Sequence, residues 1–268
     1  SEVDKNLVTN NGYTPFHVAC LFGRVRIAKI LMKQSVELKI DLTKTTNCKS
    51  TAFHLACIGG NSELTEIIMK NSDKLKISLN EIKPTDFRNC GIYGRDLTGF
   101  LYAVWYGNLK IVEMIMKNSK SMNIELNTFH RSNCTALHFA CYKSHAKIAE
   151  ILIAEATKLK LDLNAQDEWG YTAFHMACRS GLASIVNIML DQSDPPKFDL
   201  SLQTKNAQTG FHFACKAGQT KIVEMLIDAS EDIMLDLTAI DKWGKTGFQL
   251  ANNNVVELIN SKMPSLVI

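Results

Sequence analysis

The stretch TAFHMAC, at residues 172–178, decides the fold because it recurs along the chain. Close copies begin at residues 14, 51, 135 and 209, and they read TPFHVAC, TAFHLAC, TALHFAC and TGFHFAC. Two looser copies, TGFLYAV and TGFQLAN, begin at residues 98 and 246. Successive copies are 37 residues apart, except for one spacing of 47 between the second and the third. A period of roughly 20–50 residues is typical of a solenoid, a propeller or an array of small units.

Each copy predicts a turn followed by two helices. In the fifth copy, Asp167 and Gly170 mark the turn, and Thr172 stands where its hydroxyl can cap a helix. Gly181 is placed to end this first helix. A second helix follows, with apolar residues at helical spacing, namely Ile185, Val186, Ile188 and Met189. We therefore expect an all-α repeat protein, with a short extended segment leading to each next turn.

These residues resemble the ankyrin repeat family. The resemblance lies in the pattern Gly-x-Thr-(Pro/Ala/Gly)-(Leu/Phe)-His-x-Ala-Cys, followed by a Gly and by aliphatic pairs such as Ile222/Val223 with Met225/Leu226. It implies an ankyrin-repeat solenoid of helix-turn-helix units with projecting hairpin-like loops. In this family, the loops and first helices form a concave face where partners usually bind. The common period is about 33 residues, so this chain adds about one helical turn at the end of the second helix.

The copies divide the chain into repeats within a single domain, residues 1–268. We expect the repeats at about 9–45, 46–82, 93–129, 130–166, 167–203, 204–240 and 241–268, with an insertion at 83–92. Residues 1–8 match the tail of a preceding repeat, so we expect the chain to be part of a longer array or a larger protein. The last repeat is degenerate, and its sequence predicts that the two helices fuse after Ala251.

A His and a Cys stand three residues apart in five copies, as His17/Cys20, His54/Cys57, His138/Cys141, His175/Cys178 and His212/Cys215. Such a pair can be a nucleophile with its base or half of a metal site. However, a residue needed in every unit is expected to build the unit, with the His capping the helix and the Cys as a small buried residue. We therefore expect no catalytic, cofactor-binding or metal-binding residues.

The five repeated cysteines are expected to be reduced. Neighbouring helices pack about 8–10 Å apart, whereas a disulfide needs Cα atoms within about 7 Å. Cys48, Cys90 and Cys134 fall in loops, and the sequence leaves their redox state open.

If the repeated residues build the array, function should lie where the copies differ. The resemblance places ten such residues on the concave groove: Tyr13, Phe22, Arg95, Trp105, Tyr106, Tyr142, Trp169, Tyr171, Arg179 and Trp243. Trp, Tyr and Arg are enriched at binding hot spots. The alternative, that some of these aromatic residues pack against the loops, stays open. The insertion at 83–92 is a second candidate surface, with a tolerated surface loop as its alternative.

Composition narrows the class of protein. The net charge of +3 is too mild to indicate nucleic-acid binding, and no apolar run approaches the ~18 residues of a membrane span. We expect a monomeric, intracellular, cytoplasmic protein, with nuclear residence left open. The sequence favours a non-enzymatic protein–protein interaction module that binds a protein partner on its concave groove as scaffold, adaptor or inhibitor. The alternative is the cytoplasmic ankyrin array of a larger membrane channel or anchor protein, with a structural or mechanical role.

Overall fold

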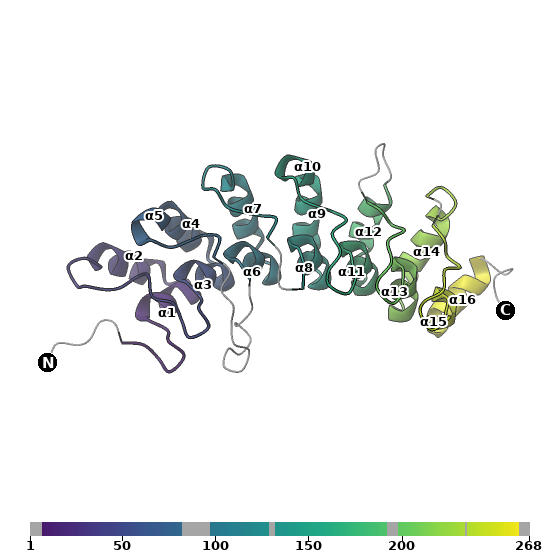
Figure 1. The fold of residues 1–268 in the computed structure, drawn as a ribbon, viewed down its shortest axis with the longest axis horizontal. Coiled ribbons are helices and arrows are strands. Elements are labelled where there is room, and N and C mark those ends of the chain that lie inside the picture. Colours follow the sequence, from purple (N-terminus) through teal and green to yellow (C-terminus); the bar gives the residue numbers. More distant parts are fainter. Residues whose placement is uncertain (1–6, 82–96, 129–131, 192–197, 234, 263–268) are drawn as a thin grey trace. The chain divides into compact units, whose positions relative to one another are not determined.

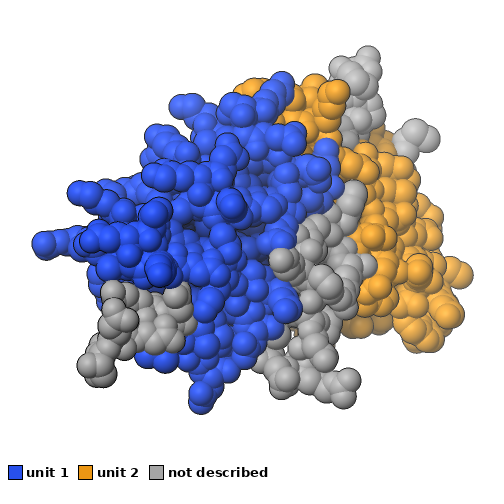
Figure 2. Space-filling model, turned by 60° about the vertical axis from the view of Figure 1, so that its left-hand side comes forward, with its two compact units in different colours: residues 1–130 blue, residues 131–268 orange. Residues whose placement is uncertain are grey.

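The computed structural model describes residues 7–81, 97–128, 132–191, 198–233 and 235–262. Regular structure in these segments is helical, apart from one isolated bridge between Ile240 and Thr246. The chain forms two compact units, unit 1 at residues 1–130 and unit 2 at residues 131–268 (Figure 2).

Unit 1 contains three helix pairs among its described residues (Figure 1). They are α1 (Pro15–Leu21) with α2 (Val25–Gln34), α3 (Ala52–Gly59) with α4 (Ser62–Lys70), and α6 (Gly99–Trp105) with α7 (Leu109–Asn118). The inner helices α1, α3 and α6 pack in one row, and the outer helices α2, α4 and α7 pack in a second. A one-turn helix, α5 (Ser72–Leu75), follows α4.

Unit 2 repeats this arrangement with four helix pairs among its described residues (Figure 1). The inner row is α8 (Ala136–Tyr142), α11 (Ala173–Ser180), α13 (Gly210–Ala217) and α15 (Gly247–Leu250). The outer row is α9 (Ala146–Ala154), α12 (Ala183–Leu190), α14 (Thr220–Ala229) and α16 (Asn253–Lys262), with α10 (Ala156–Leu159) after α9. The all-α turn-helix-helix unit predicted from the sequence is therefore confirmed.

A reciprocal pair of hydrogen bonds begins the inner helices. At α11, Thr172 Oγ1 accepts from the backbone N–H of His175 at 3.4 Å, and His175 Nδ1 accepts from the backbone N–H of Thr172 at 3.0 Å. The same pair of bonds begins α1, α3 and α8. These bonds satisfy backbone donors that the start of a helix leaves free. The repeated His thus has the structural role that its recurrence predicts.

The other ring nitrogen of the His connects consecutive repeats. Because Nδ1 accepts a hydrogen bond, the neutral ring carries its proton on Nε2. His138 Nε2 donates to the Tyr171 carbonyl at 2.9 Å, and His212 Nε2 donates to the Lys245 carbonyl at 3.1 Å. In unit 1, His54 Nε2 donates to the Glu81 carbonyl at 2.9 Å. At His54, His138 and His212 the ring therefore caps its helix and also holds the next loop.

Small residues let neighbouring inner helices approach closely. The five repeated cysteines are free and buried. At three inner helices the first residue is a glycine, and a Cβ there would lie 2.3–2.5 Å from a Phe ring of the preceding repeat. These pairs are Gly99 with Phe53, Gly210 with Phe174, and Gly247 with Phe211. Between the fourth and fifth repeats, Leu137 replaces the Phe and Ala173 replaces the Gly.

The four residues beyond the common period form an extra helical turn, as expected. In the second and fourth repeats this turn is α5 and α10. Each ends at a lysine in the left-handed region, Lys76 at φ 51° and Lys160 at φ 55°. This conformation costs a residue with a Cβ about 1–2 kcal/mol. At a helix end it is usually adopted by glycine.

The predicted fusion of the last two helices is wrong. Ala251 is extended, with ψ 145°, and the Asn252 side chain accepts from the Val255 backbone N–H at 3.1 Å. An Asn in this position starts a new helix, so α15 and α16 are separate.

Candidate functional site

The His–Cys pairs lack the electrostatics of a reactive site. Burial lowers the pKa of His175 to about 4, and it raises the pKa of Cys141 and of Cys215 to about 12. At pH 7 these thiols are protonated, whereas a nucleophile or a metal ligand must be a thiolate. Across the described ranges, no group of three or more His, Cys, Asp or Glu side chains could hold a metal ion.

The loop cysteines differ from one another. Cys134 is free and buried, and its thiol lies 3.9 Å from Asp167 Oδ2. Cys48 is disulfide-bonded. Cys90 lies outside the described residues.

The loops that join each outer helix to the next inner helix, called fingers below, present the most exposed tryptophans. The sequence Asp-x-Trp-Gly occurs in two fingers of unit 2, at residues 167–170 and 241–244. In the first, Asp167 Oδ1 accepts from the backbone N–H groups of Trp169 and Tyr171 at 2.9 and 2.8 Å. Gly170 then adopts φ +82°, where a Cβ would lie 2.9 Å from the Lys205 backbone nitrogen. This turn leaves the Trp169 side chain 54% exposed.

The second Asp-x-Trp-Gly turn has the same geometry. Asp241 Oδ1 accepts from the backbone N–H groups of Trp243 and Lys245 at 3.0 and 2.9 Å, and Gly244 adopts φ +73°. Trp243 is 64% exposed. Both tryptophans are therefore held by a buried carboxylate at the base of the turn while their rings remain in water.

Backbone hydrogen bonds connect the finger tips of unit 2 into one row. Lys205 N–H donates to the Trp169 carbonyl at 2.9 Å, and Lys242 N–H donates to the Asn206 carbonyl at 2.9 Å. Glu168 N–H donates to the carbonyl of Ser132, in the finger of the fourth repeat, at 2.8 Å. The two tryptophans therefore belong to a continuous edge of backbone, with Lys205 and Lys242 between or beside them.

Unpaired cations accompany this row. Besides Lys143 at the end of α8, five exposed cations lie on the fingers and at the ends of the inner helices: Arg179, Lys205, Lys216, Lys242 and Lys245. None of them makes an ion pair with another described residue. The ion pairs of the described part of unit 2 lie on the outer side instead, as Lys147–Glu150, Lys158–Glu155 and Lys262 with Glu224 and Asp228. These five cations thus have no ion-pair partner among the described residues, although the exposed Glu168 and the buried Asp167 and Asp241 lie on the same fingers.

The remaining candidate residues of unit 2 differ in exposure. Tyr142, at the end of α8, is 50% exposed, and Arg179 is exposed near the end of α11. Tyr171 is half-buried, with its ring centroid 6.2 Å from that of His175 and 5.1 Å from that of Phe213. Much of the Tyr171 ring therefore packs within the unit.

In unit 1, Phe22 at the end of α1 is 63% exposed. Tyr13 is half-buried, and its ring meets His17 edge-on at 6.3 Å. Trp105 and Tyr106 are half-buried at the end of α6, where Tyr106 stacks on the buried Tyr102 at 6.5 Å. Arg95 and the insertion at 83–92 lie outside the described residues. Exposed aromatic surface thus concentrates at Phe22, Tyr142, Trp169 and Trp243.

Comparisons with known proteins agree with this architecture. A family model described as ankyrin repeats (3 copies) matches residues 1–84 and 100–199. No curated protein matches the chain. Among solved structures, 557 chains match, and one of them is the crystal structure of the human ASB11 ankyrin repeat domain. That match has a TM-score of 0.72 at 18% sequence identity, and it covers 94% of this chain and 99% of the other.

Two findings bear on the kind of protein. None of the described helices combines the length and the apolar character that a membrane span needs. The matched segments cover more than half of the chain and carry the Thr-to-His caps seen in the structure. The chain therefore belongs to the ankyrin repeat family, whose repeats generally serve as protein–protein interaction modules.

Proposed function

We propose that this chain is a non-enzymatic module that holds a protein partner against the fingers and inner helices of unit 2, as scaffold, adaptor or inhibitor. The observation that carries the proposal is the pair of exposed tryptophans, Trp169 and Trp243, set in a backbone-bonded row of fingers. In each turn a buried Asp accepts two backbone hydrogen bonds, and the Trp ring carried by the turn stays exposed.

The energetics favour a partner that covers these rings. A Trp side chain buries up to about 250 Å², so half of it represents about 3 kcal/mol at about 25 cal/mol per Å². The unpaired cations, Arg179 and Lys216 among them, add attraction for carboxylates and speed association at low salt. The partner surface is accordingly expected to combine apolar groups with acidic ones. Phe22 and Tyr142 remain further candidate contacts.

A double variant tests the proposal. Trp169→Ser with Trp243→Ser removes both rings, while Ile188→Ser with Val256→Ser removes two exposed apolar side chains from the outer helices of the same unit. Each protein, after its helicity and melting are shown to equal those of the parent, serves as bait in a eukaryotic lysate, and captured proteins are identified by mass spectrometry.

We expect a small partner set to be held by the parent and by the outer-helix control, and to be lost by the Trp variant. Losing about 3 kcal/mol from one ring alone corresponds to a fall in affinity of about hundredfold, so the double variant should lose at least that much. Equal capture by all three baits would show that the proposed surface is wrong.

A further inference from the structure

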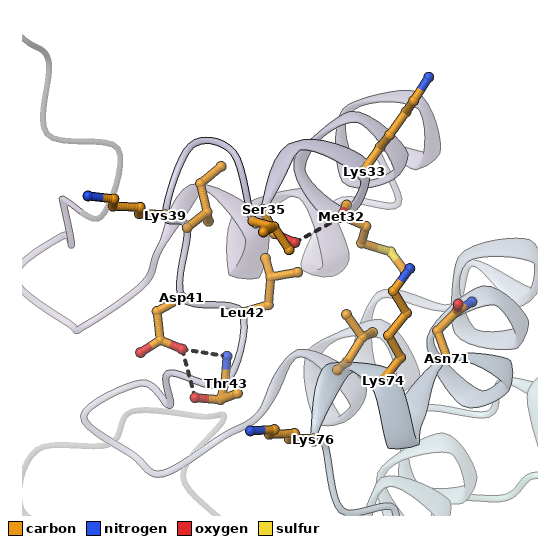
Figure 3. A pocket seen from close by; sticks show the side chains of 13 residues that line it. Met32, Lys33, Ser35, Lys39, Asp41, Leu42, Thr43, Asn71, Lys74 and Lys76 are labelled. Atoms are coloured by element: carbon orange, nitrogen blue, oxygen red, sulfur yellow. Dashed lines mark hydrogen bonds between the residues drawn. The ribbon is translucent and has the colours of Figure 1, made fainter.

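A groove of about 710 Å³ lies in unit 1, beside the end of α2 and against α5 (Figure 3). Its lining includes four apolar residues that are buried or half-buried, Met32, Ile40, Leu42 and Leu75. Val36, also in the lining, is 87% exposed. The groove therefore offers apolar surface that the chain leaves in contact with water.

The loop that lines the groove differs in its hydrogen bonds from the loop of the next repeat. In the second repeat, the Asn80 side chain donates to the Asn123 carbonyl at 2.7 Å and accepts from the Glu125 backbone N–H at 2.9 Å, which ties two neighbouring loops together. Thr43 holds the equivalent position in the first repeat. Its backbone N–H and hydroxyl both donate to Asp41 Oδ1, at 2.9 and 2.7 Å, within its own loop.

The edges of the groove are basic. Lys33, Lys74 and Lys76 line it and are exposed, and none makes an ion pair or a side-chain hydrogen bond with the described residues. Figure 3 shows Lys74 pointing toward Met32, whereas Lys33 points outward from the edge. The carboxylate in the lining, Asp41, is already engaged by Thr43. The lining holds four lysines and this one carboxylate, so positive charge exceeds negative charge in the groove.

We propose that this groove docks an acidic protein segment that carries an apolar side chain. The apolar side chain would cover Leu42 and Leu75, and flanking carboxylates would face the ammonium groups of Lys33, Lys74 and Lys76. Charge complementarity of this kind directs which partner binds and in which register. The groove is separate from the tryptophan row of unit 2, so this proposal stands or fails independently of the proposed function.

The composition of the lining favours a side chain over a flat anionic surface. The lining combines exposed lysines with apolar residues, of which Leu42 and Leu75 are buried, so a ligand that fills the groove meets both charge and apolar surface. A simple anion would pair with the lysines but would leave the apolar lining residues in contact with water. A peptide with one apolar residue between acidic residues satisfies both parts.

The experiment uses a phage-displayed library of random dodecapeptides selected on the whole chain. The library is first depleted on a Lys74→Glu, Lys76→Glu variant, so that peptides bound elsewhere are removed. Binding of the recovered peptides is then measured by fluorescence anisotropy. The matched control is a Lys110→Glu, Lys117→Glu variant, because these lysines are exposed on α7 of the same unit and line no part of the groove. Circular dichroism first shows that both variants melt like the parent.

We expect the recovered peptides to be acidic with an apolar residue between the acidic ones. Their affinity should fall at least about tenfold in K74E/K76E, stay within about twofold in K110E/K117E, and weaken with added salt. Failure to recover peptides after depletion, recovery of neutral or basic peptides, or equal weakening in both variants would overturn the proposal. Binding to phosphatidylserine vesicles that depends on Lys74 and Lys76, without recovery of acidic peptides, would overturn it in favour of a lipid surface.

Discussion

Replacing His175 by Gln should make the stability of unit 2 less sensitive to acid without removing the helix cap. The last repeat supplies the precedent, because Gln249 occupies the His position there. Gln249 Oε1 accepts from the Thr246 backbone N–H at 3.2 Å, and Thr246 Oγ1 accepts from the Gln249 backbone N–H at 3.3 Å. A Gln at position 175 can therefore make the same pair of bonds with Thr172.

The magnitude follows from the pKa of His175. Burial, aided by neighbouring His138 and His212, lowers this pKa from 6.5 to about 4. Between pH 6.5 and about pH 4, the unfolded chain binds a proton at His175 that the folded chain does not bind. The free energy of unfolding therefore keeps its full value above pH 6.5 and decreases as the pH falls toward 4. The full effect is about 3 kcal/mol, of which about 2 kcal/mol develops between pH 7 and pH 4.5.

Urea unfolding at pH 7 and at pH 4.5 measures the effect. At pH 7 we expect His175→Gln to cost about 1 kcal/mol, since the ring contacts with Tyr171 and Phe213 are lost. Between pH 7 and pH 4.5 the variant should lose about 2 kcal/mol less than the parent. The matched control is Gln249→His. It places a His in the same helix cap, but at an exposed site.

The stability of Gln249→His should change little more with acid than that of the parent, because burial does not disfavour the charged form of an exposed imidazole. The reasoning is refuted if His175→Gln loses as much stability in acid as the parent does, or if Gln249→His becomes as acid-sensitive as the buried site.

Two further changes test the packing and the helix ends. Gly210→Ala should destabilise unit 2 by about 1–3 kcal/mol, because the new Cβ would lie 2.3 Å from the Phe174 ring; adding Phe174→Leu should recover part of this loss in the urea midpoint, and no recovery would contradict the contact. Lys160→Gly should stabilise by about 0.5–1 kcal/mol, because φ 55° suits glycine. Lys158→Gly, inside α10, should instead destabilise by about 1 kcal/mol, and equal effects of the two glycines would contradict this assignment.

The sequence predicts the helical unit because its chemistry is local. Thr172 and His175 are three residues apart, and that spacing alone brings their side chains and backbone groups together at a helix start. The extra turn was equally visible as four residues beyond the common period. The end of the array was predicted wrongly because Asn252 competes with helix continuation, and an Asn can either cap a helix or lie within one.

The candidate site was only partly predictable, because exposure depends on neighbouring repeats. Tyr171 and Tyr106 occupy expected groove positions, yet Phe213 and Tyr102 cover much of their rings. Trp169 remains exposed at a turn that Asp167 closes, and the Asp-x-Trp-Gly pattern could have indicated that turn. The groove of unit 1 is lined by residues from the end of α2, the following loop and α5, and no spacing rule identifies a groove between them.

The central claim is that the repeated residues build the array and that exposed, non-repeated residues bind the partner. Calorimetric titration of the captured partner at pH 7 into the parent, the Trp169→Ser, Trp243→Ser variant and the His175→Gln variant tests it most directly. The account predicts that the Trp variant loses at least about hundredfold in affinity while keeping its stability, and that His175→Gln binds like the parent. Undiminished binding by the Trp variant, with loss of binding in His175→Gln at unchanged fold, would contradict it.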